Sequence, residues 1–89
     1  MALTKETVVD KIEVLEMGQV QVRTATRVKE DGAVLSSSFH RHVVEPSTKA
    51  SGSWADTDIS GEDARVQAVA NATWTDSVKT AYQEMIDAT

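Results

Sequence analysis

The sequence predicts an α+β fold, a three-stranded antiparallel β-meander followed by two short C-terminal helices packed on one sheet face. Three observations predict it. Apolar and polar residues alternate through the first half of the 89-residue chain, which is typical of half-buried strands. Asp31-Gly32, a strong hairpin signal, separates two such runs. Beyond Gly61 the apolar spacing becomes helical. We expect one domain, with strands at about residues 7–15, 19–29 and 34–44.

The first hairpin is expected to turn through a three-residue loop that holds Gly18 in the left-handed conformation. This loop places Val14 opposite Val20 and Ile12 opposite Val22. A two-residue turn would instead oppose Ile12 and Val14 to polar residues. The longer loop is therefore favoured.

The second hairpin is expected to use a two-residue turn at Asp31-Gly32. That turn places Thr24 opposite Phe39 and Val20 opposite Val43, whereas a three-residue loop would oppose apolar residues to histidines. The apolar face then consists of the even-numbered residues of the first two strands with Leu35, Phe39 and Val43. The opposite face is polar and carries Gln21, Arg23, His40 and His42.

Residues 45–60 are small and polar and include the only proline, so we expect a linker there. Two helices are expected at about residues 61–72 and 76–87. Their N-terminal signals are a capping-box pattern, Ser60 with Asp63, and the pair Thr75-Asp76. Apolar residues at helical spacing should lie on the sheet, namely Val66, Val69 and Ala70, then Val78, Ala81, Tyr82, Met85 and Ile86.

Composition restricts the function. The chain has no cysteine, which excludes disulfides and thiolate metal sites, and its net charge of −5 argues against nucleic-acid binding. No apolar run approaches the length that crosses a bilayer, and the N-terminus lacks an apolar signal segment. We therefore expect neither nucleic acid nor membrane as a partner. Only four residues are aromatic, and such a thin core favours burial against another chain.

His40 and His42 lie two apart on one strand, so both rings point to the same side. Such a pair can chelate a metal ion, but a third ligand is needed and Arg23 opposite His40 would repel a cation. We expect no metal here, and cross-strand hydrogen bonds on a solvated face. Together with Gln21, these donors could contact a carboxylate-bearing partner.

Arg41 projects among apolar residues in the expected register. Either its stem packs on them while the guanidinium reaches the sheet edge, or it anchors an interface. Trp54 in the linker either folds back onto the core or docks on a partner, whereas Trp74 is expected in the core. Two open sheet edges could also extend a partner's sheet. The candidate partner-binding residues are Arg41, Trp54, His40, His42 and Arg23.

Catalytic patterns are missing. There is no cysteine nucleophile and no glycine-rich phosphate loop. Ser38 and His40 share a strand face without an orienting acid, and Asp56 and Asp58 lie in the linker, where nothing would raise a carboxyl pKa. We expect no enzyme and no cofactor.

The segments QVRTAT, EDG and FHRHVV, followed by a Trp-Thr-Asp…Val-Lys-x-Ala-Tyr helix, resemble a group of small tailed-bacteriophage proteins, common in phages of aquatic bacteria. The likeness covers most of the chain except about residues 47–58. It implies a phage origin and a role in or around the virion. Together with the thin core, this leads to the hypothesis of a minor virion component of the tail, neck or capsid, made in the host cytoplasm, that binds other phage structural proteins or copies of itself as a homo-oligomer. The likeness implies no active site. The alternative is a non-virion accessory protein, an assembly chaperone or an inhibitor of a host protein.

Overall fold

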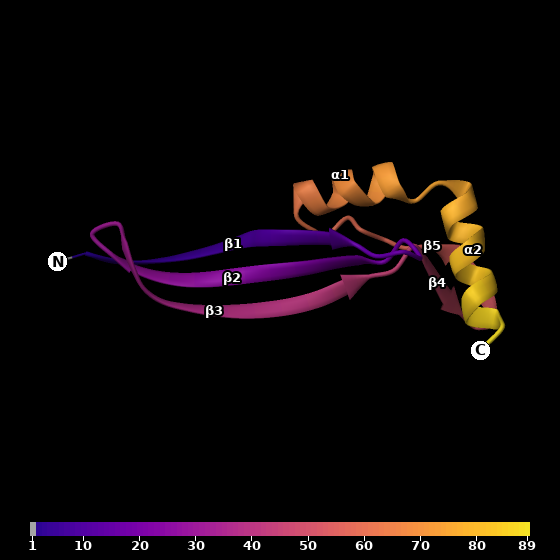
Figure 1. The fold of residues 1–89 in the computed structure, drawn as a ribbon, viewed down its shortest axis with the longest axis horizontal. Coiled ribbons are helices and arrows are strands. Elements are labelled where there is room, and N and C mark those ends of the chain that lie inside the picture. Colours follow the sequence, from indigo (N-terminus) through magenta and orange to yellow (C-terminus); the bar gives the residue numbers. More distant parts are fainter. Residues whose placement is uncertain (1) are drawn as a thin grey trace.

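The computed structural model describes residues 2–89 and has the α+β fold that the sequence predicts. A three-stranded antiparallel sheet has the order β1-β2-β3, and a second, two-stranded sheet pairs β4 with β5. Two C-terminal helices follow (Figure 1). The elements are β1 (Leu3–Val14), β2 (Val20–Glu30), β3 (Ala33–Val44), β4 (Ser47–Ala50), β5 (Ser53–Asp56), α1 (Ala64–Thr73) and α2 (Asp76–Asp87).

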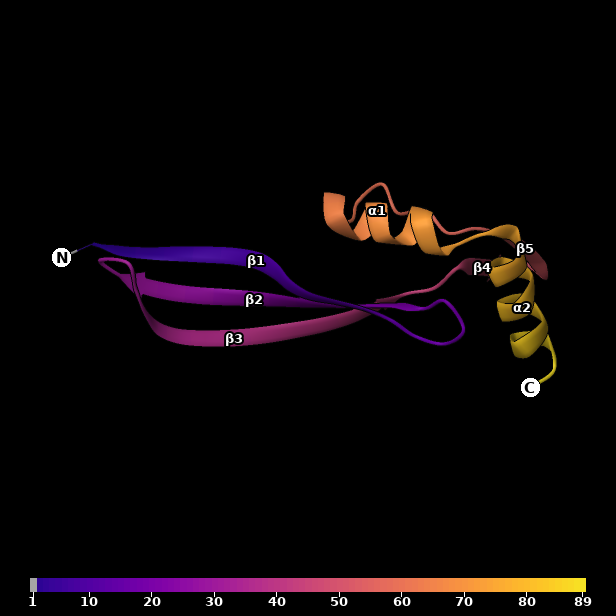
Figure 2. The ribbon, with the colours of Figure 1, turned by 45° about the horizontal axis from the view of Figure 1, so that its top comes forward.

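The molecule is elongated, with extents of 56 × 23 × 22 Å. The long sheet forms a ribbon that ends in a tip where β1 begins and β2 turns into β3 (Figure 2). Both helices and the small β4–β5 hairpin gather at the opposite end (Figures 1 and 2). One end of the sheet is therefore covered by other elements, while the tip extends beyond them.

The first hairpin has the predicted register. Val14 pairs with Val20 and Ile12 with Val22, and Gly18 has a φ of 88° in the turn. The first strand begins at Leu3, earlier than the expected residue 7, because paired charges on β1 and β2 extend the ladder towards the tip. The register shifts at Asp10, which forms a bulge in β1.

The second hairpin turns at Asp31-Gly32 as predicted, but the predicted register beyond the turn is wrong. Leu35 is an extra, bulged residue between Val34, paired with Lys29, and Ser36, paired with Val28. From there on, every residue of β3 is displaced by one position relative to the expectation. A slip of one residue moves each side chain to the other face of the sheet.

This slip reverses the two faces that were assigned to the third strand. Val20 pairs with Val44 and Thr24 pairs with His40, so His40 and His42 share the face of the apolar core. Phe39 and Val43, which were expected in the core, each remain 50% exposed on the other face. Arg41 lies on the same face as Phe39 and Val43. It was expected beside Val20, Val22 and Phe39, but the two valines lie on the opposite face.

The core lies between the sheet and α1. On the sheet it consists of the fully buried Val20 and Val22 together with Val44, and α1 contributes Val66 and Ala70. The helix begins at Ala64, later than expected, because Asp63 and not Ser60 is its N-cap, with the carboxylate accepting the Arg65 N–H. The predicted apolar residues of this helix nevertheless face the core.

The second helix has its predicted bounds, and Thr75 caps it by accepting the Val78 N–H. It packs on β4, where Gln83 Nε2 donates to Ser47 Oγ at 3.0 Å. The expected linker at 45–60 thus contains a hairpin that sequence reasoning missed. It turns through Ser51 and Gly52, both with positive φ. Since α2 lies on this hairpin, α1 supplies the cover of the long sheet.

Candidate interaction surface

The sheet face that points away from α1 is called the open face below. It carries Arg23 and Ala25 of β2 with Phe39, Arg41 and Val43 of β3, since these residues alternate with the core residues of their strands. Ala25 is fully buried between its paired neighbours on β1 and β3, while Phe39 and Val43 are half exposed. The open face therefore presents an apolar patch to its surroundings.

Arg23 is the most constrained cation of the open face. Its Nε and Nη2 atoms donate to the two carboxylate oxygens of Asp10 at 2.9 and 2.8 Å. Its guanidinium also lies 4.6 Å from the centre of the Phe39 ring. The bulge in β1 brings the Asp10 carboxylate to this face, and the Arg23 hydrogen bonds lower the pKa of Asp10. Arg23 is therefore held in one place and orders the patch around Phe39.

A second group of charges lies nearer the tip. Glu6 accepts from Arg27 Nη1 and from Lys29 Nζ, both at 3.0 Å. The hydrogen bonds from Lys29 and Arg27 lower the pKa of Glu6. Exposed pairs of this kind add little stability. Their role here is to align β1 with β2 along the uncovered part of the sheet.

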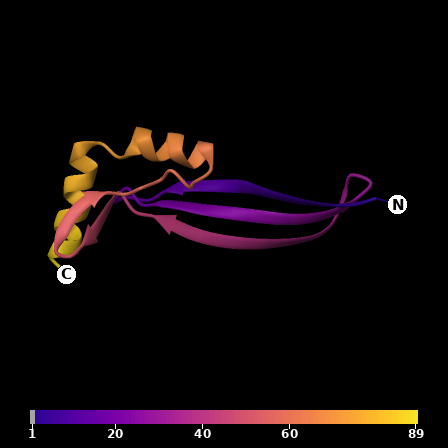
Figure 3. The ribbon, with the colours of Figure 1, turned by 180° about the vertical axis from the view of Figure 1, so that it is seen from behind.

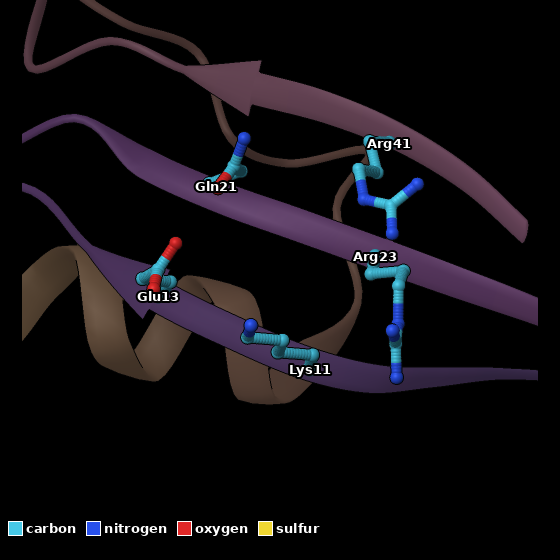
Figure 4. A pocket seen from close by; sticks show the side chains of 5 residues that line it. All are labelled: Lys11, Glu13, Gln21, Arg23 and Arg41. Carbon is cyan, nitrogen blue, oxygen red and sulfur yellow. The ribbon is translucent and has the colours of Figure 1, made fainter.

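A small, shallow hollow lies at the helical end of the open face. Figure 4 shows its lining, in which Arg41 extends from β3 towards β2. Arg41 is directly opposite Arg23 in the register, and like charges in that position repel. Within residues 2–89 no carboxylate forms an ion pair with Arg41. A carboxylate from a partner would relieve this repulsion. The lining residues are Lys11, Glu13, Gln21, Arg23 and Arg41.

The open face is also where the cations of this acidic protein gather. Five of the nine Lys and Arg residues of the chain lie on it, against the carboxylates of Glu6, Asp10 and Glu13. The positive charge contrasts with the net charge of −5 for the whole chain. The five cations are Lys11, Arg23, Arg27, Lys29 and Arg41.

The two histidines lie on the core side of the sheet, away from Arg23 and Arg41. His42 Nε2 hydrogen bonds with Glu62 Oε1 at 2.7 Å, which ties β3 to the segment before α1. The rings of His40 and His42 stack with 6.3 Å between their centres, and His40 is exposed. In the described part of the chain, no three His, Asp or Glu side chains are grouped so as to hold a metal ion.

Trp54 folds back onto its own chain. Its Nε1 donates to Asp87 Oδ2 at 3.1 Å, and its ring meets Tyr82 edge-on at 6.1 Å between centres. Lys49 Nζ lies 2.8 Å from Asp87 Oδ1, and Lys49 and Trp54 together lower the pKa of Asp87. Trp74 is in the core as predicted, and its Nε1 donates to the Gly18 carbonyl oxygen at 2.7 Å.

Of the five candidate residues, the structure brings Arg23 and Arg41 together on the open face. His42 and Trp54 make contacts within the chain, and His40 lies on the other side of the sheet. Phe39 and Val43 belong to the surface but were assigned to the core from the sequence. The signal that could have revealed this was Arg41, a charged side chain in the middle of the expected apolar face.

Comparison with protein-family models, with curated proteins and with solved structures found no match. Neither helix among residues 2–89 combines the length and the apolar character that a membrane crossing requires.

Proposed function

We propose that this chain is a small structural protein of a tailed-bacteriophage particle, and that its long sheet binds copies of itself or a larger particle protein. The observation that carries the proposal is a sheet longer than its core. The buried residues Val20, Val22 and Val44 lie at one end, under α1, and large apolar side chains remain exposed elsewhere on β3. These exposed side chains are Val34, Leu35, Phe39 and Val43, between 50% and 57% accessible.

A partner that covers the exposed apolar side chains would stabilise this sheet. Covering the exposed half of Phe39 alone adds about 1 kcal/mol from apolar burial. Arg23 is already fixed by Asp10 and the Phe39 ring, so binding costs little further side-chain entropy there. Arg41 gives the surface a preference for a carboxylate. The favoured partner surface is therefore apolar with at least one acidic residue.

The phage setting of the proposal is supported by the resemblance of the QVRTAT, EDG and FHRHVV segments. These segments include the turn and most of the strand residues that build the open face. The likeness also extends to the C-terminal helix, so it covers most of the chain and includes the open face.

Mass spectrometry of purified particles tests the proposal. The chain should be present in mature particles in a defined copy number. Particles from phage that encodes Phe39→Ser should contain much less of it, since the substitution removes the central apolar contact. Ile86→Ser is the matched control, because Ile86 is an exposed apolar residue on α2, and incorporation should be unchanged.

Absence of the unmodified chain from mature particles would contradict the proposal. It would favour the accessory role, as an assembly chaperone or host-protein inhibitor. Circular dichroism of both variants verifies that each retains its fold, so that a loss of incorporation reports on contacts.

A further inference from the structure

We infer that two copies of this chain pair antiparallel along their β3 edges, so that their sheets join into one continuous sheet with a twofold axis beside Phe39. The inference rests on the proposed function and names its first partner, a second copy. Three features of the structure lead to it: a closed β1 edge, an open β3 edge, and a β3 sequence that complements itself.

The β1 edge is protected against strand addition. The Asp10 bulge interrupts its regular register, and the guanidinium of Arg65 donates from Nη2 to the Val9 carbonyl oxygen. Lys5 and Lys11 add charges along the same strand. Bulges, lysines and covering side chains are the devices by which proteins block edge-to-edge pairing.

Beyond its bulge at the tip and the charge of Arg41, the β3 edge has none of these devices. Its register with β2 is unbroken from Ser36 to Val44, and this stretch contains no proline or lysine. No described residue outside the sheet hydrogen bonds to the β3 backbone. Figures 1 and 3 show β3 along the margin of the sheet that is remote from α1. Its outer N–H and C=O groups are free to pair with another strand.

The side chains of β3 match those of a second β3 when the pair is centred on Phe39. The two Phe39 rings then lie opposite each other on the open face, Val43 lies opposite Leu35, and Arg41 lies opposite Ser37. On the other face, His40 lies opposite Ser38. Aromatic and aliphatic cross-strand pairs are stabilising, and no formal charge is opposed to a like charge.

Other centres fit less well. Centring the pair on Arg41 would place the two guanidinium groups opposite each other, which is repulsive. Centring it on Ser37 would carry Val43 past the end of the strand, opposite Asp31 in the turn. Of these three registers, the one centred on Phe39 has the longest overlap and keeps the charges apart. A symmetric pair of this kind is the commonest form of homo-oligomer.

The first experiment measures mass in solution. Sedimentation equilibrium of the full chain should give twice the chain mass of 9.7 kDa. Phe39→Lys places two ammonium groups at the axis and should raise the dissociation constant at least tenfold. Thr7→Lys, which adds the same charge to β1 on the closed edge, is the matched control and should leave the dissociation constant unchanged.

The second experiment reads the register directly. The chain has no cysteine, so a single introduced cysteine forms a dimer only through its own counterpart. Directly opposed cross-strand residues have Cβ atoms about 4.5–5.5 Å apart, which is near the spacing that a disulfide needs. Under mild oxidation, Phe39→Cys should give a covalent dimer, and Ser37→Cys, four positions from its counterpart, should not.

A chain that stays monomeric at millimolar concentration would overturn the inference. So would a dimer that tolerates Phe39→Lys, or one cross-linked faster through Ser37→Cys than through Phe39→Cys. These results would leave the proposed function standing, provided that the chain is found in purified particles. Absence of the chain from purified particles would overturn the proposed function but would not contradict the inferred dimer.

Discussion

Gly18 lies where the turn of the long sheet contacts the elements at the helical end of the molecule. It is buried in the β1–β2 turn, with Pro46 before β4, Trp74 after α1 and Val78 of α2 around it. Its φ of 88° lies in the left-handed region. A Cβ atom at this position would overlap Val78 Cγ1 and lie 3.1 Å from Pro46 Cγ. We expect Gly18→Ala to destabilise the protein through both backbone strain and steric overlap.

The two contributions can be estimated separately. A left-handed alanine costs about 1–2 kcal/mol in backbone strain. Inserting a methyl group into a filled space costs about 1–3 kcal/mol more, and the β-branched Val78 on a helix has little freedom to move aside. Gly18→Ala should therefore lower the free energy of unfolding by about 2–5 kcal/mol, a large part of the total for a domain of this size.

Gly32→Ala is the control that isolates the overlap. Gly32 has nearly the same φ, 86°, but a Cβ there meets nothing within 4 Å. It should cost only the backbone strain, about 1–2 kcal/mol. Urea unfolding followed by tryptophan fluorescence measures both variants, since Trp74 lies beside Gly18. Equal losses for the two variants would show that the contacts around Gly18 are not close-packed and would refute the reasoning.

Three further outcomes are expected. Trp74→Phe leaves the Gly18 carbonyl without its 2.7 Å donor and should cost about 1–3 kcal/mol in the same urea assay; no change would mean that water replaces the bond. Arg23 lowers the pKa of Asp10 in the folded protein below its usual value of 3.8. The Asp10 carboxylate therefore stabilises the fold fully above pH 3.8, and this stabilisation is lost as the pH falls through the lowered pKa of the folded state. Thermal unfolding between neutral pH and about pH 2 should thus be less pH-dependent in Asp10→Asn, and an identical acid slope would count against the ion pair. Burial and the Glu45 carboxylate raise the pKa of Tyr82, the only tyrosine, from 10.0 to about 12. The protonated Tyr82 side chain therefore stabilises the fold fully below pH 10.0, and this stabilisation is lost as the pH rises towards 12. Tyrosinate absorbance of the folded protein with a midpoint near pH 10 would contradict this.

The elements that could be predicted from the sequence are those with local signals. The first hairpin follows from Gly18, because only one loop length opposes Val14 to Val20 and also uses a left-handed glycine. The bounds of α2 follow from the Thr75 cap and from apolar residues at helical spacing. In each case, one short stretch of chain determines the geometry.

The faces of β3 could not be predicted, because a bulge leaves no clear mark in the alternation. Val34 and Leu35 are both apolar, as are Val43 and Val44, so either register gives the strand an apolar end. The single-residue insertion at Leu35 then decides that Val44 is buried and Val43 is exposed. The charge of Arg41 was the one indication, and it is explained once Arg41 lies on the open face.

Only part of the candidate surface could be predicted from the sequence. Arg23 and Arg41 were selected from the sequence as potential contact residues, and the structure places them opposite each other. The sequence did not predict that Asp10 is the carboxylate that fixes Arg23, because Asp10 reaches the open face only through the bulge in β1. The β4–β5 hairpin was missed because four-residue strands are too short for an alternation pattern to be recognised.

The contact from Arg65 to the Val9 carbonyl oxygen has a consequence beyond local packing. A sheet with two unprotected edge strands can polymerise, since each added copy exposes an unpaired edge strand again. Here one margin is sealed by a side chain from α1. The proposed association along β3 would therefore stop at a pair of chains and would not grow into a fibre.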